Sequence, residues 1–206
     1  LVPMVAGADF AILSPEGVLQ SPASWFEAAG RLHATHLGAP NFALDLCTTA
    51  IDPDGLAADL LSTVTHLVCG GEPVRERSVN CFFRRFEAVG ARRATLLPHY
   101  GLSEIGAVAT ARPSEGPAFV HLEAAALRER RLCPATEADG GLAIAAVGPV
   151  DDGCTLRIVD PRRGIACADG ELGEILTGAC PATDILGASR GFLKLLRRGV
   201  LRHRDE

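Results

Sequence analysis

Two short segments of the sequence combine glycine with side chains that could bind a ligand. They are residues 69–73 (CGGEP) and residues 99–104 (HYGLSE). Because glycine lacks a Cβ atom, a flat ligand can lie directly against the backbone at such a position. In the second segment Tyr100 offers a ring face, Ser103 could donate to a phosphate, and Glu104 could hold a divalent cation. Mg²⁺ in particular prefers one or two carboxylates together with substrate oxygens.

Each of these segments also has an ordinary structural explanation. The glycines at 70 and 71 are typical of a turn that ends a strand. The serine at 103 and the glutamate at 104 suit the exposed first turn of a helix. The sequence alone therefore leaves both interpretations open at each segment.

Two further segments carry weaker signals. Residues 38–45 (GAPNFALD) could line an apolar pocket, or they could be a helix start with Asn41 as its cap and Phe42 in the core. Residues 169–174 (DGELGE) predict a tight turn into a strand, with an architectural role.

The chain around the first two segments alternates between predicted strands and helices. Residues 63–69 (TVTHLVC) predict a buried parallel strand that ends at the glycines. Residues 78–89 carry three phenylalanines at helical spacing, and residues 94–97 predict the next strand. This succession predicts a doubly wound α/β sheet, in which ligands bind beyond the carboxyl ends of the strands. Both glycine-bearing turns lie at those ends, so we expect them to meet in space.

The remaining elements divide the chain into parts. We expect an α/β subdomain over residues 1–142, a small, mostly antiparallel β subdomain over 143–178, and a basic tail over 179–206. The pattern predicts helices at 24–37, 41–50, 55–62 and 122–130, and strands at 142–147, 155–159 and 174–176.

Composition excludes several classes of protein. The 206 residues carry a net charge of −5, which does not fit the basic footprint of a nucleic-acid-binding protein. No apolar run approaches the roughly 18 residues of a membrane span. The seven cysteines form no CxxC pair, so we interpret them as buried free thiols of a protein in the reducing cytoplasm.

Together and in this order, the motifs resemble those of the adenylate-forming superfamily: acyl- and aryl-CoA ligases, nonribosomal adenylation domains and luciferases. Residues 100–104 (YGLSE) are similar to its YGxTE-type motif, with Ser for Thr, and residues 169–175 to its GExGEI strand. Residues 39–47 (APNFALDLC), 70–75 (GGEPVR) and 157–161 (RIVDP) most resemble fatty acyl-AMP ligases, with Gly for Ala at 71. The resemblance covers roughly residues 1–178, and the 112–142 region lies where that subfamily carries an insertion.

The resemblance implies a role for each matching residue. The adenine of ATP or AMP would be bordered by the first segment and by the start of the second, with Tyr100 stacking near it. Ser103 and Glu104 would be catalytic, Ser103 meeting the phosphate and Glu104 coordinating Mg²⁺. The implied nucleotide-binding residues are Gly70, Gly71, Glu72, Pro73, His99, Tyr100, Gly101 and Ser103, and the implied acyl-binding residues are Asn41, Phe42 and Asp45.

The implied reaction joins a fatty acid to ATP, giving acyl-AMP and pyrophosphate. The acyl group would then pass to the phosphopantetheine thiol of an acyl carrier protein, or to CoA. The family's phosphate loop and catalytic lysine would lie outside residues 1–178, and the 206 residues contain no match to them. We therefore expect an inactive or weakly active fragment. The alternatives are a non-catalytic nucleotide- or acyl-binding or scaffolding module of a lipid or polyketide synthase system, and a remnant without ligand function.

Overall fold

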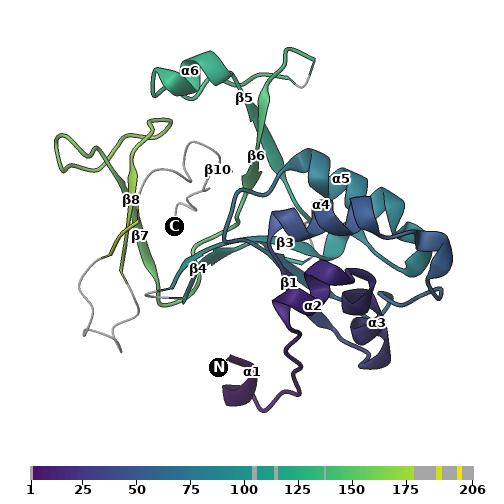
Figure 1. Cartoon of the computed structure of the whole chain (residues 1–206). Helices are drawn as coiled ribbons and strands as arrows, with labels where there is room; N and C mark the ends of the chain where they lie inside the picture. Colours follow the sequence, from purple (N-terminus) through teal and green to yellow (C-terminus); the bar gives the residue numbers. More distant parts are fainter. Residues whose placement is uncertain are drawn as a thin grey trace.

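The computed structural model describes residues 2–103, 106–113, 116–136, 138–178, 189–191 and 199–200 (Figure 1). The helices are α1 (Val2–Val5), α2 (Pro15–Gln20), α3 (Ala23–Arg31), α4 (Asn41–Ala50), α5 (Glu76–Arg85) and α6 (Ala124–Arg128), with 3₁₀ helices η1 (Pro53–Gly55), η2 (Glu87–Val89) and η3 (Arg93–Thr95). The strands are β1 (His36–Ala39), β2 (His66–Cys69), β3 (Leu96–Leu102), β4 (Gly106–Thr110), β5 (Phe119–Leu122), β6 (Leu142–Ala146), β7 (Thr155–Val159), β8 (Glu174–Gly178), β9 (Ser189–Gly191) and β10 (Gly199–Val200).

The main sheet has the strand order β1-β2-β3-β4. The first three strands are parallel, and β4 runs antiparallel to β3. Helices α4 and α5 connect the parallel strands, pack against each other, and lie on one side of the sheet (Figure 1). This mixed sheet with covering helices confirms the predicted α/β class.

Aromatic side chains form the centre of the core between α3 and α5. Phe26 and Phe86 are completely buried, and their ring centroids are 4.8 Å apart in an edge-to-face arrangement. Phe82 adds a second edge-to-face contact with Phe26 at 5.9 Å. Edge-to-face pairs add to the free energy of burial because the positive ring edge meets the negative ring face.

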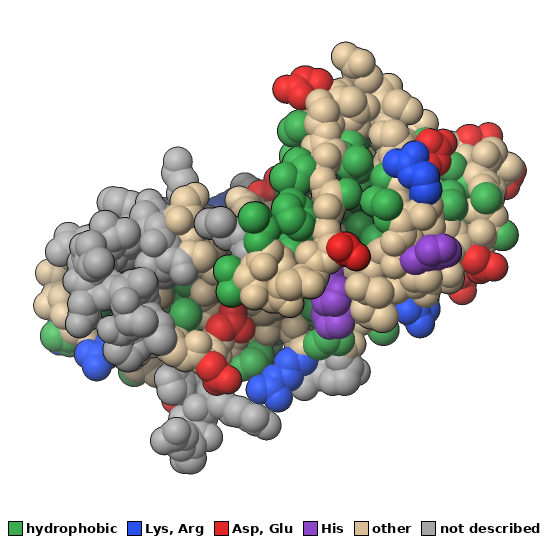
Figure 2. Space-filling model, turned by 90° about the horizontal axis from the view of Figure 1, so that it is seen from below, with side chains coloured by type: hydrophobic (Ala, Val, Ile, Leu, Met, Phe, Trp, Pro, Cys, Tyr) green, Lys and Arg blue, Asp and Glu red, His purple; other side chains and the backbone are tan. Residues whose placement is uncertain are grey.

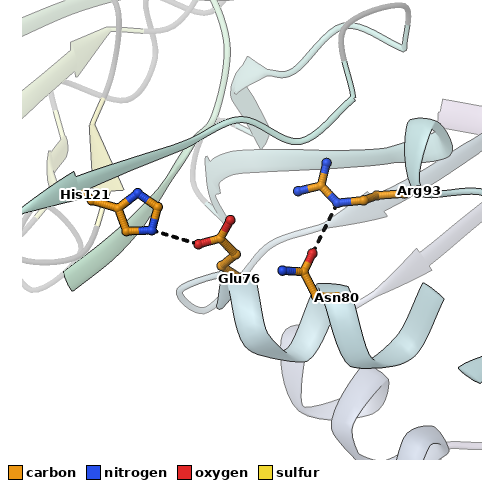
Figure 3. Close-up of polar contacts among 4 residues, drawn as sticks. All are labelled: Glu76, Asn80, Arg93 and His121. Atoms are coloured by element: carbon orange, nitrogen blue, oxygen red, sulfur yellow. Dashed lines mark hydrogen bonds and ion pairs between the residues drawn. The ribbon is translucent and has the colours of Figure 1, made fainter. Parts of the chain in front are cut away.

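Two smaller sheets complete the described part of the chain. One has the order β10-β6-β5 and the other β7-β8-β9. His121 of β5 contacts Glu76 at the start of α5, with 3.0 Å between Nε2 and Oε2 (Figure 3). This contact ties the second sheet to the helix that follows the first glycine-bearing turn. The antiparallel β5–β6 and β7–β8 pairs agree with the strands predicted at 142–147, 155–159 and 174–176.

The predicted helix over residues 24–37 is too long. Helix α3 ends at Arg31, and His33 adopts a left-handed conformation with φ 48°. The Ala34 N–H donates to the Ala29 carbonyl, which closes the helix end in the way that a glycine usually allows. The chain then turns into β1, which the sequence pattern did not reveal because a histidine stands where the turn would ordinarily be marked by glycine.

The predicted helix over residues 55–62 is wrong. Only the short η1 forms there, and Asp59 has a left-handed φ of 63°. The Leu61 N–H donates to the Val89 carbonyl instead of to its own segment. This bond to the end of η2, which lies far away in the sequence, overrides the local helix propensity.

Ser103 lies in a turn, and the described residues on either side of the second segment show no helix at the position considered for it. Strand β3 extends through Leu102, and Gly106 starts the antiparallel strand β4 with a left-handed φ of 79°. In the residues that the structure describes, no helix has the length and apolar character needed to cross a bilayer.

The two buried thiols Cys47 and Cys69 lead to a prediction about chemical reactivity. Burial raises the pKa of Cys47 to about 11, and burial, with a smaller contribution from Glu72, raises the pKa of Cys69 to about 12. Because the thiolate is the nucleophile, iodoacetamide at pH 8 should label the half-buried Cys81 and Cys133 and spare Cys47 and Cys69. Peptide mass spectrometry measures this, with the denatured chain as the fully labelled control. Native labelling of Cys47 at the denatured rate would contradict the predicted protection.

Candidate functional site

The two glycine-bearing turns lie next to each other at the carboxyl ends of β2 and β3. The register aligns Cys69 with Pro98, so the residues that follow each of them are neighbours. A Cβ atom added to Gly70 would lie 2.5 Å from the His99 carbonyl oxygen and 2.7 Å from His99 Cδ2. We call residues 70–73 the first corner and residues 99–103 the second corner.

The imidazole of His99, the first residue of the second corner, lies close to both Gly70 and Gly101. Its Cδ2 atom faces Gly70, and its Cε1 atom lies 3.0 Å from the position that a Cβ atom on Gly101 would take. Burial lowers the pKa of His99, while the charge of Asp151 opposes this shift. The Asp151 carboxylate accepts a hydrogen bond from Thr110 Oγ1 at 3.0 Å. The lowered pKa favours a neutral His99 ring at neutral pH. The ring packs against the backbone of Gly70 and Gly101, where a side chain with a Cβ atom would not fit.

Asp151 and Thr110 were missed in the sequence reasoning. In the sequence, the aspartates at 151 and 152 stand before a glycine, a pattern typical of a turn between strands. Their proximity to His99 follows from the pairing of His99 with Thr110 across β3 and β4. Because β4 itself was not predicted, the sequence held no signal for this contact.

Tyr100 occupies a more enclosed position than the other residues of the second corner. Its side chain is 6% exposed and packs with Val108 of β4 and Ile175 of β8. Burial raises the pKa of its phenol, which keeps the hydroxyl protonated. The ring therefore supports the junction of two sheets and leaves little surface for a ligand in this conformation.

The predicted phosphate residue lies at the end of the second corner. Ser103 is exposed in the turn after β3. Glu104 lies outside the described residues. Within the described ranges, no group of three or more histidines, cysteines or acids is placed to hold a metal ion. Mg²⁺ binding therefore stays a proposal.

The predicted acyl residues lie at the start of α4, beside the first corner. Phe42 is 53% exposed, so its alternative placement in the core is wrong. Its backbone N–H donates to Glu72 Oε1 at 2.6 Å. Asp45 is half-buried one turn further along the helix and accepts from Asn41 Nδ2 at 3.3 Å. The structure thus brings the nucleotide and acyl candidates together at one edge of the sheet.

Asn41 is buried, with 1% of its side chain exposed. Its Oδ1 accepts from the Arg75 N–H at 2.9 Å, and its Nδ2 donates to Ser78 Oγ at 3.2 Å. Pro40, rather than Asn41, stands at the cap position of α4. The expected capping role is therefore corrected: the amide bridges to the segment before α5 and to α5 itself.

The remaining corner residues differ in exposure. Gly71 is exposed and left-handed with φ 78°, and Pro73 is half-buried. Figure 2 shows one face of the molecule, on which acidic, basic, histidine and hydrophobic side chains are interspersed. The described part of this face presents no continuous basic surface.

Comparisons with known proteins point in one direction. The family described as AMP-binding enzyme matches residues 1–181. The long-chain-fatty-acid–AMP ligase FadD23 of Mycobacterium tuberculosis is 30% identical over 174 residues, which are 84% of this chain and 30% of the relative. The medium-chain-fatty-acid–[acyl-carrier-protein] ligase JamA of Moorena producens is 31% identical over 177 residues, or 84% and 30% of the two chains.

Solved structures give the same picture. The fatty acyl-adenylate ligase from L. pneumophila, solved with acyl adenylate and pyrophosphate, matches with a TM-score of 0.79 and 29% identity. The match covers 86% of this chain and 31% of that one. The fold therefore resembles the N-terminal part of the adenylate-forming fold, and the chain spans about 30% of the length of the curated relatives it matches.

Proposed function

Because the chain belongs to the AMP-binding enzyme family, whose sequence model matches residues 1–181 of its 206, we propose that it forms the adenylate-binding part of a fatty acyl-AMP ligase. The ligase would join a fatty acid to ATP and pass the acyl group to a carrier-protein thiol. The names of two relatives, a fatty-acid–AMP ligase and an acyl-carrier-protein ligase, support this choice. The observation that carries it is the contact between Gly70 and His99.

The two corners would hold the nucleotide. Gly71, where an added Cβ atom would meet nothing within 4 Å, would let the adenine approach the backbone closely, while Gly70 and Gly101 let the two corners pack tightly around His99. Glu72, Pro73 and the neutral His99 ring would border it, while Tyr100 supports the corner from behind and offers the adenine the part of its ring that stays exposed. Ser103 would donate to the α-phosphate, and Glu104 would hold Mg²⁺.

The fatty acid would lie along the start of α4. The exposed ring of Phe42 offers an apolar surface for the acyl chain, and Asn41 and Asp45 fix the first turn that carries this ring. A carboxylate oxygen of the fatty acid would attack the α-phosphorus of ATP. The bond from that phosphorus to the bridging oxygen would break, and pyrophosphate would leave with both electrons of that bond.

Such a transfer depends on positioning and on neutralising the charge that develops at phosphorus. The 206 residues contain neither the Ser/Thr/Gly-rich phosphate loop nor a lysine in a matching context. We therefore propose that this chain alone binds adenylate but turns over at background level, in the cytoplasm. The missing match to the phosphate loop and lysine also favours a second candidate, a non-catalytic nucleotide- or acyl-binding or scaffolding module. An in-frame phosphate loop in the adjoining coding sequence would support the ligase over this second candidate.

Calorimetry with AMP and with a non-hydrolysable acyl-sulfamoyl adenosine tests the proposal. Wild-type chain should bind both saturably, and Tyr100→Ala should weaken both by about tenfold, since the second corner loses the buried ring that supports it from behind. Tyr100→Phe keeps the ring and should bind like wild type, as should Glu27→Ala on the exposed side of α3. Pyrophosphate release should stay at background. A folded wild-type chain that binds neither ligand would refute the proposed function.

A further inference from the structure

We infer that Asn41 and Glu72 mechanically couple the nucleotide side of this site to its acyl side and act as positioning residues for both. The inference rests on the proposed function for its ligands. Its structural basis is a pair of reciprocal hydrogen bonds between two helix starts. In the first bond, Glu72 of the first corner accepts from a backbone N–H of α4. In the second bond, Asn41 of α4 accepts from the backbone N–H of Arg75, which precedes α5.

Both helix starts lie at the ligand-binding edge of the sheet. In a parallel sheet, each connecting helix begins just beyond the carboxyl end of the strand before it. Helix α4 begins at Asn41, directly after β1, and α5 begins at Glu76, directly after the first corner. The first N–H groups of any helix lack partners within that helix and need acceptors from elsewhere.

Each helix start receives its acceptor from the other segment. Glu72 of the first corner accepts from the Phe42 N–H in the first turn of α4 at 2.6 Å. A carboxylate is favoured at this position because the helix dipole is positive at its N-terminus. Conversely, Asn41 of α4 accepts from the N–H of Arg75, the residue that caps α5, at 2.9 Å.

Burial makes the Asn41 contacts rigid. Asn41 and its partner Ser78 are both buried, and a buried amide that loses a partner is left without water to replace it. The Asn41 carbonyl and amino groups are both used, toward Arg75 on one side and toward Ser78 and Asp45 on the other. The amide thus fixes the placement of α4 relative to α5 and to the residue that precedes α5.

The coupling reaches the acyl side through Phe42. The same residue donates its backbone N–H to Glu72 and presents an exposed aromatic ring. A nucleotide that fixes the first corner therefore also fixes the backbone that carries this ring. Because coupling free energies are reciprocal, an acyl chain resting on the ring would in turn hold the corner.

Amide hydrogen exchange of the full chain tests the coupling without any ligand. Asn41→Ala and Glu72→Ala should each speed exchange at both Phe42 and Arg75 by about tenfold, because the two bonds open together. Glu72→Gln keeps an acceptor oxygen and should restore slow exchange at Phe42. If Asn41→Ala speeds exchange at Arg75 alone and Glu72→Ala at Phe42 alone, the two bonds are independent caps and the inference is overturned.

The matched controls are Asn80→Ala and Glu27→Ala. Asn80 is an exposed asparagine on the same helix α5, where its Oδ1 accepts from Arg93 Nε at 3.3 Å (Figure 3). Glu27 is exposed on α3. Neither change should alter exchange at Phe42 or Arg75. Faster exchange at both amides in a control variant would mean general loosening and would also overturn the inference.

Binding measurements with two ligands distinguish a positioning role from a general effect on stability. Glu72→Ala should weaken the acyl-sulfamoyl adenosine by about tenfold more than it weakens AMP, because the acyl group also needs the Phe42 ring in place. Equal weakening of the two ligands would contradict a positioning role toward the acyl chain. A wild-type chain that binds neither ligand yet shows the linked exchange would refute the proposed ligase function and leave the coupling between the two segments established.

Discussion

Replacing Gly70 with alanine is expected to distort the junction of the two corners and to abolish most nucleotide binding. The added Cβ atom would lie 2.5 Å from the His99 carbonyl oxygen, a backbone atom that cannot rotate away. Crowding of this kind lowers the free energy of unfolding by about 1–3 kcal/mol. A comparable loss of binding free energy would weaken AMP by about tenfold to a hundredfold. Urea denaturation and calorimetry measure the two effects.

Gly55→Ala is the matched control for this substitution. A Cβ atom on Gly55 would meet nothing within 4 Å, and its backbone is not left-handed. Its stability should change by no more than about 0.5 kcal/mol and its AMP affinity should stay that of wild type. If Gly70→Ala also bound AMP with wild-type affinity, the contact between Gly70 and His99 would not be part of the nucleotide site. The central observation behind the proposed function would then be lost.

The Phe26→Ala substitution should have the largest effect on stability. Phe26 is completely buried and makes edge-to-face contacts with Phe86 at 4.8 Å and Phe82 at 5.9 Å. Truncating a buried phenylalanine costs about 3–5 kcal/mol, through lost burial and the cavity left behind. Since domains of this kind are stable by about 5–15 kcal/mol in total, the variant should unfold at a much lower urea concentration.

Trp25, the single tryptophan of the sequence, reports on this core directly. Its ring centroid lies 5.6 Å from that of Phe26, so its fluorescence follows the packing around the mutated residue. Phe42→Ala offers the same chemical change at a 53% exposed position and should alter stability by no more than about 0.5 kcal/mol. Similar midpoints for the two variants would show that the α3–α5 core does not govern global unfolding.

Local sequence signals predicted some elements well. Helix α4 spans Asn41–Ala50, as its pattern between two breaks predicted, and β7 spans Thr155–Val159 as predicted. In both segments the spacing of the hydrophobic residues is sufficient to indicate the element. Strand β4 and the end of α3 were missed because each depends on a left-handed residue, Gly106 or His33, and the histidine does not mark such a turn in the sequence.

The candidate site was predictable in its backbone and less so in its side chains. The glycines at the strand ends were sufficient to place the two corners at one edge of the sheet, and Gly70 does contact the residue before Tyr100. The role of Asn41 could not be read from the sequence because its partners Arg75 and Ser78 follow 34 and 37 positions later. The enclosed position of Tyr100 likewise depends on Ile175 of another sheet.

The strands of the main sheet follow one another in space in the order in which a ribosome would deliver them. Thr65 donates to the Thr35 carbonyl across 30 positions of chain, at the point where β1 and β2 begin to pair. At about 5–20 residues synthesised per second, β2 and β3 would each emerge a few seconds after the preceding parallel strand, and β4 would follow β3 almost at once. The two connections between the parallel strands are similar in length and so carry a similar entropic cost of closure. The sheet is therefore suited to growth from one side, strand by strand, while the chain is still being made.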